Sequence, residues 1–252
     1  MIEAAQTQGE VIMLKYVEPL HWLPTAEELP DSDDTPVDNE LQELAPTLLK
    51  LILAQIWALR SDWFFGIDMG VYYNPDEPPI VPDAFLSVGV ARVKSEDLRL
   101  SYVLWEEQGI LPQLTLEVVS KKYRGEYSTK KDLYERLGVL YYVIYNPRRR
   151  LKPTLEVYKL IQGKYLPVVG NPLWLPELGL GLGKERQVYQ GIEREWLFWY
   201  DAQGQRYPTP QEEALQQRQR ADQESQRADA VEAQLQALRD RLRAQGIDPD
   251  QL

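Results

Sequence analysis

The composition of the chain changes abruptly near Thr209, and this change limits how the protein can be built. From Thr209 onward Gln, Ala, Arg and Glu dominate, whereas residues 170–207 are rich in Gly and Trp. In the later segment apolar residues are spaced by 3, 4, 3 and 4 positions, at Ala228, Val231, Leu235, Leu238 and Leu242. This is the heptad spacing of a coiled-coil seam. We therefore expect a loose N-terminal arm over residues 1–13, a globular domain over 14–207 and a C-terminal helical tail over 208–252.

The tail leaves three alternatives open. Toward Thr209 the seam positions become polar, so that only about two to three heptads carry the pattern, which is short for autonomous pairing. The helix can pair with a second copy to form a homodimer, pack on its own domain or stay exposed. Residues 246–249, Gly-Ile-Asp-Pro, are expected to end it.

The globular segment alternates patterns that are typical of helices and strands. A first helix is expected over 38–60, capped by Asp38 or Asn39 and either bent at Pro46 or starting there. The remaining expectations are strands over 63–73, 80–90, 113–119 and 140–145, a second helix over 126–137, and a hairpin of 154–161 with 165–169. This order predicts an α/β fold with a mixed β-sheet flanked by helices.

A glycine-rich stretch follows the hairpin. Residues 179–184 read Gly-Leu-Gly-Leu-Gly-Lys and superficially resemble a phosphate-binding loop. Their spacing fits neither a P-loop nor a dinucleotide-binding fingerprint, and no helical pattern follows directly. We interpret the stretch as part of a turn-rich connection.

The absence of cysteine removes several kinds of chemistry. With no cysteine and one histidine, His21, the chain can form no disulfide, no thiolate nucleophile and no metal site with two histidine ligands. His21, between Leu20 and Trp22, is expected to be structural. Catalysis would have to rest on carboxylates, lysine, tyrosine or a cofactor, and carboxylates favour hard ions such as Mg²⁺.

The charge of the chain is acidic overall. Lys and Arg total 28 against 39 Asp and Glu, a net charge of −11, and residues 27–43 hold eight acidic residues and no basic one. The N-terminus lacks the basic start and apolar run of a signal peptide, and the apolar stretch 48–59 is too short to span a bilayer. We expect a cytoplasmic protein with no membrane partner.

Two carboxylates interrupt apolar strand patterns. Asp83 precedes Ala-Phe-Leu-Ser-Val, and Glu117 lies within Leu-Thr-Leu-Glu-Val-Val. A charge buried in an apolar strand is expensive unless it is paired or bound to a metal. On neighbouring strands these two acids would form a site for a divalent cation that activates water and stabilises phosphate charge. The alternatives are an aspartate at a strand edge and a glutamate paired with a lysine of the next helix.

Several separated motifs occur in the same order as in a known family. They are Val-Pro-Asp83, Leu-Glu117-Val-Val-Ser120, Tyr127-Ser-Thr-Lys130 with Tyr134, Gly138-Val139 and Tyr-Tyr-Val-Ile-Tyr-Asn-Pro147. Over roughly residues 14–207 the chain resembles the Uma-type restriction endonuclease family, a bacterial family of the PD-(D/E)XK nuclease superfamily.

The resemblance implies a restriction-endonuclease-like core and a metal-dependent DNA endonuclease in which Asp83 and Glu117 hold Mg²⁺ or Mn²⁺. The superfamily's usual lysine, two residues after the second acid, is replaced here by Val119. In such members the following helix supplies the lysine, and Lys130 matches; Lys131 should point some 100° away. A glutamate of the first helix often completes the site, and Glu40 is preferred here over Glu43.

A basic segment follows the second acid. Residues 121–152 carry ten basic and three acidic residues, a density that favours nonspecific binding of DNA phosphates. Residues 148–150, Arg-Arg-Arg, fit a solvated loop equally well. The tyrosines Tyr123, Tyr127 and Tyr134 are interpreted as core residues more readily than as base-stacking ones.

Two hypotheses follow from these observations. The first is a DNA endonuclease with Asp83, Glu117, Lys130 and Glu40 at its site. The second is a catalytically silent DNA-binding or assembly module that keeps the nuclease fold and uses the C-terminal helix to bind a partner. The presence of Asp83, Glu117 and Lys130 together favours the first hypothesis, whereas the acidic total and the valine at position 119 favour the second.

Overall fold

The protein divides into two compact units, residues 1–207 and 208–252, and each is considered by itself. A computed structural model describes residues 23–30, 39–94, 96, 98–121, 123–148 and 151–245. Several predictions lie outside the described residues: the arm over 1–13, His21, capping by Asp38, the helix stop at 246–249, and the basic residues Lys122, Arg149 and Arg150.

A six-stranded sheet forms the centre of the first unit. Its order is β1 (Trp63–Ile67), β3 (Ala84–Val88), β5 (Leu114–Val118), β6 (Tyr141–Tyr145), β7 (Leu155–Ile161) and β8 (Lys164–Val168). Strands β5 and β6 are parallel, whereas the other neighbouring pairs are antiparallel. The sheet is therefore mixed, and the predicted α/β class is confirmed.

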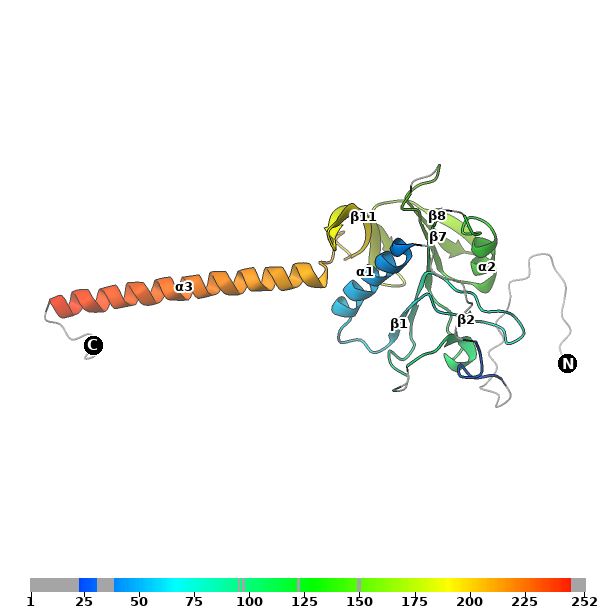
Figure 1. Ribbon diagram of the computed structural model, residues 1–252, viewed down its shortest axis with the longest axis horizontal. Coiled ribbons are helices and arrows are strands. Elements are labelled where there is room, and N and C mark those ends of the chain that lie inside the picture. The colour runs from blue at the N-terminus through cyan, green and yellow to red at the C-terminus, as the bar shows by residue number, and fades with distance from the viewer. Residues whose placement is uncertain are drawn as a thin grey trace. The chain divides into compact units, whose positions relative to one another are not determined.

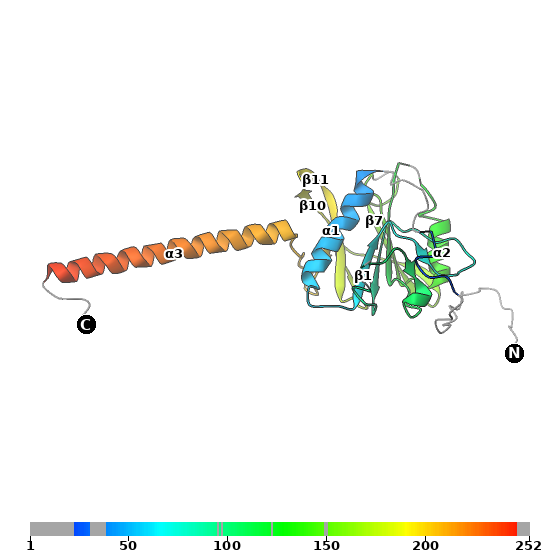
Figure 2. The ribbon, with the colours of Figure 1, turned by 60° about the horizontal axis from the view of Figure 1, so that its bottom comes forward.

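The two faces of this sheet are covered by different elements. On one face α1 (Glu40–Ile56) and a second sheet share a core with Leu116 and Val143, and on the other α2 (Thr129–Leu137) contributes Tyr134 to a cluster with Tyr142 and Ile144. Figures 1 and 2 show α1 and α2 on opposite sides of the sheet. Because side chains alternate along a strand, neighbouring residues of β5 and β6 face different layers.

The first helix starts at Glu40 and continues through Pro46. The side chain of Asn39 accepts a hydrogen bond from the Leu41 N–H, and the helix ends at Ile56. The alternative that the helix begins at Pro46 is therefore wrong. Leu44, Ala45, Pro46 and Leu48 are all buried, so burial of this face stabilises the helix despite the hydrogen bond that Pro46 cannot donate.

The glycine-rich region is a sheet, and its interpretation as a turn-rich connection is wrong. Strands β9 (Leu173–Leu175), β10 (Leu180–Tyr189) and β11 (Ile192–Tyr200) form an antiparallel sheet in the order β11-β10-β9. Trp196, Leu197, Phe198 and Trp199 are buried within it. The indole N–H of Trp199 donates to the Leu49 carbonyl oxygen at 2.9 Å, which ties this sheet to α1.

Local sequence patterns locate most of the other elements. The hairpin β7–β8 turns at Gln162 and Gly163, which both have positive φ, 50° and 77°, as a type I′ turn requires. The predicted strand over 63–73 is divided into β1 and the short β2 (Val71–Tyr72), which pairs in parallel with β4 (Tyr102–Val103). A 3₁₀ helix, η1 (Leu104–Glu106), follows β4. Neither β4 nor η1 was expected from the sequence.

The second unit contains α3 (Pro210–Ala244), a single helix of 35 residues. Thr209 and Glu212 form a capping box at its start, and Pro210 occupies its first turn, an arrangement that fixes where a helix begins. No residue of α3 is buried. Across the residues that the structure describes, no helix has the length and apolar character needed to cross a membrane.

Candidate active site

The register of two strands places Asp83 opposite Glu117. In the antiparallel pair of β3 and β5, Ala84 lies opposite Leu116, so the next residue outward on β3, Asp83, lies opposite Glu117. Leu116 and Val118 face the core shared with α1, and alternation therefore turns Glu117 toward α2. The exposed fraction of Glu117 is 1%. Glu117 thus points to the sheet face that α2 covers, and Asp83 lies beside it just before the start of β3.

Helix α2 supplies the partners of Glu117. Lys130 Nζ donates to Glu117 Oε2 at 2.7 Å, and the Tyr134 hydroxyl donates to Glu117 Oε1 at 2.7 Å. Lys130 and Tyr134 are four residues apart and share one face of the helix. Gly125 has a φ of +89° and accepts a hydrogen bond from the Lys130 N–H through its carbonyl. The turn at Gly125 therefore fixes the start of α2 and the position of Lys130.

Asp83 is held by a strand and by the first helix. Its Oδ2 accepts a hydrogen bond of 2.5 Å from the Val118 N–H, and its Oδ1 accepts one of 3.1 Å from Gln42 Nε2. The Asp83 carbonyl also accepts from the Asp68 N–H at 3.2 Å. Elements distant in sequence, α1 and β5, therefore fix the orientation of the Asp83 carboxylate.

Burial and mutual repulsion shift the pKa values of these groups. Burial, followed by the negative charge of Glu117, raises the pKa of Asp83 to about 7. Burial raises the pKa of Glu117, and Lys130 and Tyr134 offset part of this effect. Burial alone would lower the pKa of Lys130, but Glu117 and Asp83 more than compensate and raise it, so Lys130 is a cation. Because each negative charge disfavours ionisation of the other carboxyl group, a cation bound between the two acids would be stabilising.

The donor set of Asp83 and Glu117 fits a hard divalent ion. Both are carboxylates, and each oxygen that already accepts one hydrogen bond keeps a second lone pair. Within the described part of the chain, no group of three or more His, Cys, Asp or Glu side chains is arranged to hold a metal. Water or phosphate oxygens would have to complete the coordination of a hard ion here.

The four predicted site residues are only partly brought together. Asp83, Glu117 and Lys130 share one cluster, whereas Glu40 is exposed at the start of α1. Gln42, two residues further along α1, donates a hydrogen bond to Asp83 instead. Lys131 Nζ lies 3.5 Å from the ring centroid of Tyr158, as expected for a lysine that points away from its neighbour. The role of Glu40 stays a prediction.

Three further residues influence this cluster, and the sequence did not predict a function for any of them. Tyr134 contacts Glu117 directly, and Glu126, which is buried, raises the pKa of both Glu117 and Lys130 through its charge. The charge of Asp68 contributes to the raised pKa of Asp83. A usable signal existed for Tyr134, because it follows Lys130 by one helical turn.

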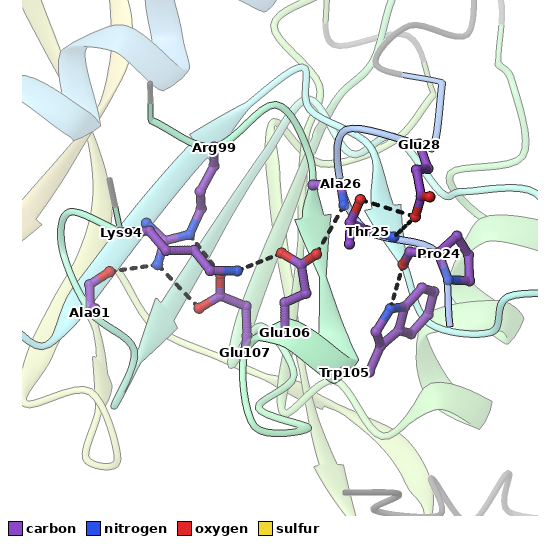
Figure 3. Close-up of polar contacts among 10 residues, drawn as sticks. All are labelled: Pro24, Thr25, Ala26, Glu28, Ala91, Lys94, Arg99, Trp105, Glu106 and Glu107. Carbon is purple, nitrogen blue, oxygen red and sulfur yellow. Dashed lines mark hydrogen bonds and ion pairs between the residues drawn. The ribbon is translucent and has the colours of Figure 1, made fainter. Parts of the chain in front are cut away.

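The acids at the end of η1, Glu106 and the following Glu107, belong to a different cluster. Glu106 accepts a hydrogen bond from the Ala26 N–H at 2.9 Å and pairs with Lys94, while Glu107 accepts from Arg99 Nε at 2.8 Å. Figure 3 shows these contacts together with the Trp105 indole N–H, which donates to the Pro24 carbonyl. These carboxylates fasten residues 24–28 and the segment around Arg99 to η1, and they are already occupied by those partners.

Basic residues follow the two parallel strands at the same edge of the sheet. The carboxyl ends of parallel neighbours meet at one edge, and β5 leads to Lys121 while β6 leads to Arg148. Both of these residues are exposed, as are Arg124, Arg136 and Lys152. Lys121 and Arg148 therefore lie at the end of the sheet where β5, which carries Glu117, and β6 both finish.

Comparison with known proteins identifies one family. The family model Uma2, described as "Putative restriction endonuclease", matches residues 34–189, which is more than half of the chain. The matched region begins before α1 and ends at the last residue of β10, and it includes Asp83, Glu117 and Lys130. No curated protein matches the chain significantly.

Proposed function

The chain belongs to the Uma2 family of putative restriction endonucleases, and we propose that it is a metal-dependent DNA endonuclease that hydrolyses phosphodiester bonds. Its fold, an α/β core with a mixed sheet between helices, is that of a restriction-endonuclease-like protein. The proposal places the reaction at the cluster of Asp83, Glu117 and Lys130.

The observation that carries this proposal is the placement of two largely buried acids on neighbouring strands, one of which is paired with a lysine. Glu117 is 1% exposed and lies 2.7 Å from Lys130 Nζ. A purely structural role would be costly, because apolar residues of similar size stabilise a core at least as well as a buried ion pair. The arrangement is also the one that a two-carboxylate metal site needs.

In the proposed reaction the residues of this chain would bind the metal ion, orient the attacking water and neutralise charge on the phosphate. Asp83 and Glu117 would hold Mg²⁺ or Mn²⁺, and when bound such an ion activates water and stabilises phosphate charge. Lys130 would orient the attacking water and offset the charge that develops on the phosphate. Tyr134 and Gln42 would keep the two carboxylates in place, and Glu40 would assist through water.

DNA is the proposed partner, and the exposed basic residues at the β5–β6 edge would bind its phosphates. Lys121 lies beyond the end of β5, which carries Glu117, and Arg148 lies beyond the end of its parallel neighbour β6. Contacts of this kind bind DNA without reading its sequence. The cytoplasmic location expected from the sequence stays a prediction, as does a homodimer formed through α3.

Nicking of supercoiled DNA tests the proposal directly. We expect the purified full chain to nick DNA with Mg²⁺ or Mn²⁺ but not with EDTA, and we expect Asp83→Asn and Glu117→Gln each to abolish nicking. Glu193→Gln is the matched control, because Glu193 is 61% exposed in a surface ion pair with Arg186. Nicking that persists in both site variants would place the reaction elsewhere.

A catalytically silent DNA-binding or assembly module is the second candidate. One observation favours it: each oxygen of Glu117 already accepts a hydrogen bond, from Lys130 or from Tyr134, as in an ion pair whose role is structural. In that case DNA would bind in a salt-dependent manner, no metal-dependent cleavage would occur, and the two site variants would bind DNA as tightly as the wild type.

A further inference from the structure

The apolar seam of α3 is exposed in the single chain. Val231, Leu235 and Leu238 have exposed fractions of 64%, 48% and 54%, and they follow the spacing of alternating a and d positions. A helix of this length spans about 50 Å. Such a seam on a polar helix is buried when two helices pair.

The charges beside the seam match those of a second copy in a parallel arrangement. With Ala228 at position a, Arg227 occupies position g and Glu232 the following position e. In a parallel, in-register pair each g residue faces the e residue five positions later on the other helix. Arg227 would therefore face the partner's Glu232, and the symmetry of the pair forms this contact twice.

The same rule holds along the whole helix. Glu213 would face the partner's Arg218, which gives a second complementary contact near the start of α3. The remaining g–e combinations join Arg220 with the partner's Ser225 and Gln234 with the partner's Arg239, so none brings like charges together. Among the described residues, no ion pair within the chain occupies Arg227 or Glu232.

An antiparallel arrangement uses less of the helix. Placing Leu235 against the partner's Leu238 buries the same leucines and brings Glu232 toward the partner's Arg239. The charges at the C-terminal end of α3 are therefore compatible with both the parallel and the antiparallel orientation. However, that alignment leaves residues 210–227 without a partner helix and loses the contact between Glu213 and Arg218. The full set of charges therefore favours the parallel orientation.

We propose that α3 pairs with the same helix of a second copy as a parallel, in-register, two-stranded coiled coil, with apolar layers from Ala228 to Leu242. This inference deepens the proposed homodimer and does not depend on whether the chain cleaves DNA. Because the helices run in the same direction, both globular units attach to the same end of the coiled coil. Glu224 occupies a d position, so two carboxylates meet in one layer and weaken the association.

Sedimentation of the full chain tests the association. The mass should rise from one chain toward two with concentration, and Leu235→Asp with Leu238→Asp should hold it at one chain. Gln226→Asp with Ala233→Asp is the matched control, since both positions lie on the outer face of the helix, and circular dichroism checks that helix content is kept. A wild-type mass of one chain at all concentrations, or a limit of four chains, would overturn the proposal.

The absence of cysteine makes the orientation directly measurable. Leu238→Cys should form an intermolecular disulfide under mild oxidation, because position 238 meets itself only in the parallel register, whereas the outer-face variant Gln236→Cys should stay reduced. Glu224→Leu should strengthen the dimer, because position 224 also meets itself in the parallel register and the change removes two facing carboxylates. If Leu238→Cys chains remain unlinked while mixtures of Leu235→Cys and Leu238→Cys chains cross-link, the helices are antiparallel and the proposal is wrong.

Two further variants separate the charge contacts from the seam. Arg227→Glu should weaken the dimer, and adding Glu232→Arg to the same chain should restore it, because the exchanged charges again attract across the parallel pair. Absence of restoration would contradict the proposed register. Since none of these measurements uses DNA, their failure is distinguishable from a failure of the proposed nuclease function.

Discussion

At the scale of single residues, the Glu117 carboxylate depends on two donors that come from one face of α2. Lys130 supplies charge, while the Tyr134 hydroxyl supplies a hydrogen bond without charge. Tyr134 is buried, and burial together with Glu117 raises its pKa well above the ordinary value. The tyrosine therefore acts as a neutral donor at all accessible pH values and orients the carboxylate rather than exchanging protons with it.

Tyr134→Phe should weaken metal binding with little change in fold. Removal of the hydroxyl leaves Glu117 Oε1 without its donor, and loss of such an orienting contact typically costs about 10-fold to 100-fold in metal affinity. Titration calorimetry with Mn²⁺ measures the effect. Tyr142→Phe is the matched control, because its buried hydroxyl donates to the Glu126 carbonyl and not to a site carboxylate. Equal losses in the two variants would assign Tyr134 a structural role only.

The raised pKa of Asp83 predicts a specific dependence of stability on pH. Burial and Glu117 hold this pKa at about 7, against an ordinary value of 3.8. Between these two values the folded protein binds one more proton than the unfolded chain does, so its stability falls as the pH rises from about 4 to about 7. Above pH 7 the whole penalty is present.

Asp83→Asn should remove this penalty. In EDTA, the gain in unfolding free energy of the variant over the wild type should be about 3 kcal/mol larger at pH 8 than at pH 5, because each of the roughly two pH units between pH 5 and the folded pKa contributes about 1.4 kcal/mol. Urea denaturation at the two pH values measures it, with Glu193→Gln as the control. A gain that does not change with pH would show that Asp83 has an ordinary pKa.

How well the sequence predicts the site depends on whether spacing or packing decides each position. Asp83, Glu117 and Lys130 could be identified because two acids interrupt apolar strands and the lysine matches a motif. The family analogy favours Glu40 over Glu43, yet Gln42 is the residue of α1 whose side chain donates to Asp83. Gln42 shares a helix face with the buried Ala45 and Leu49, and this helical spacing was the signal that would have favoured it.

At the scale of elements, the β9–β11 sheet shows where local patterns mislead. Alternating glycines usually indicate turns, and here Gly181 and Gly183 lie within a ten-residue strand. The reason is a contact distant in sequence: a Cβ atom at Gly183 would lie 2.8 Å from Tyr200 Cε2 and 3.0 Å from Asn171 Oδ1. By contrast, the β7–β8 hairpin was predictable because its turn and its alternation are both local.

Gly183→Ala should therefore destabilise the first unit by about 1–3 kcal/mol, since the added methyl group forces Tyr200 or the backbone at Pro172 to move. Gly70→Ala serves as the control, because its Cβ atom would meet only ordinary contacts of 3.5 Å and longer. Urea denaturation compares the two variants. Equal stability of both would show that Tyr200 yields without cost and that the glycine is not required for packing.

At the scale of the whole molecule, the net charge of −11 averages two opposite regions. Residues 27–43 are acidic, whereas residues 121–152 are basic. The fold concentrates part of the basic region. The parallel pairing of β5 with β6 brings Lys121 and Arg148 to one end of the sheet although 27 positions separate them in the sequence. The sequence alone shows the density of charge but not this convergence, which depends on the order of strands in the sheet.

The combined variant Lys121→Gln and Arg148→Gln should weaken DNA binding and flatten its dependence on salt. Each phosphate contact that is lost releases about one counterion fewer, so the slope of log affinity against log salt concentration should decrease in magnitude by about 2. Fluorescence anisotropy with a labelled duplex between low and moderate salt measures the slope. Arg60→Gln with Arg243→Gln is the charge-matched control, since both arginines form exposed ion pairs, with Asp62 and Asp240, outside the segments that follow β5 and β6. If the two double variants change the slope equally, the acidic chain binds DNA through its overall charge distribution and the β5–β6 edge has no special part in it.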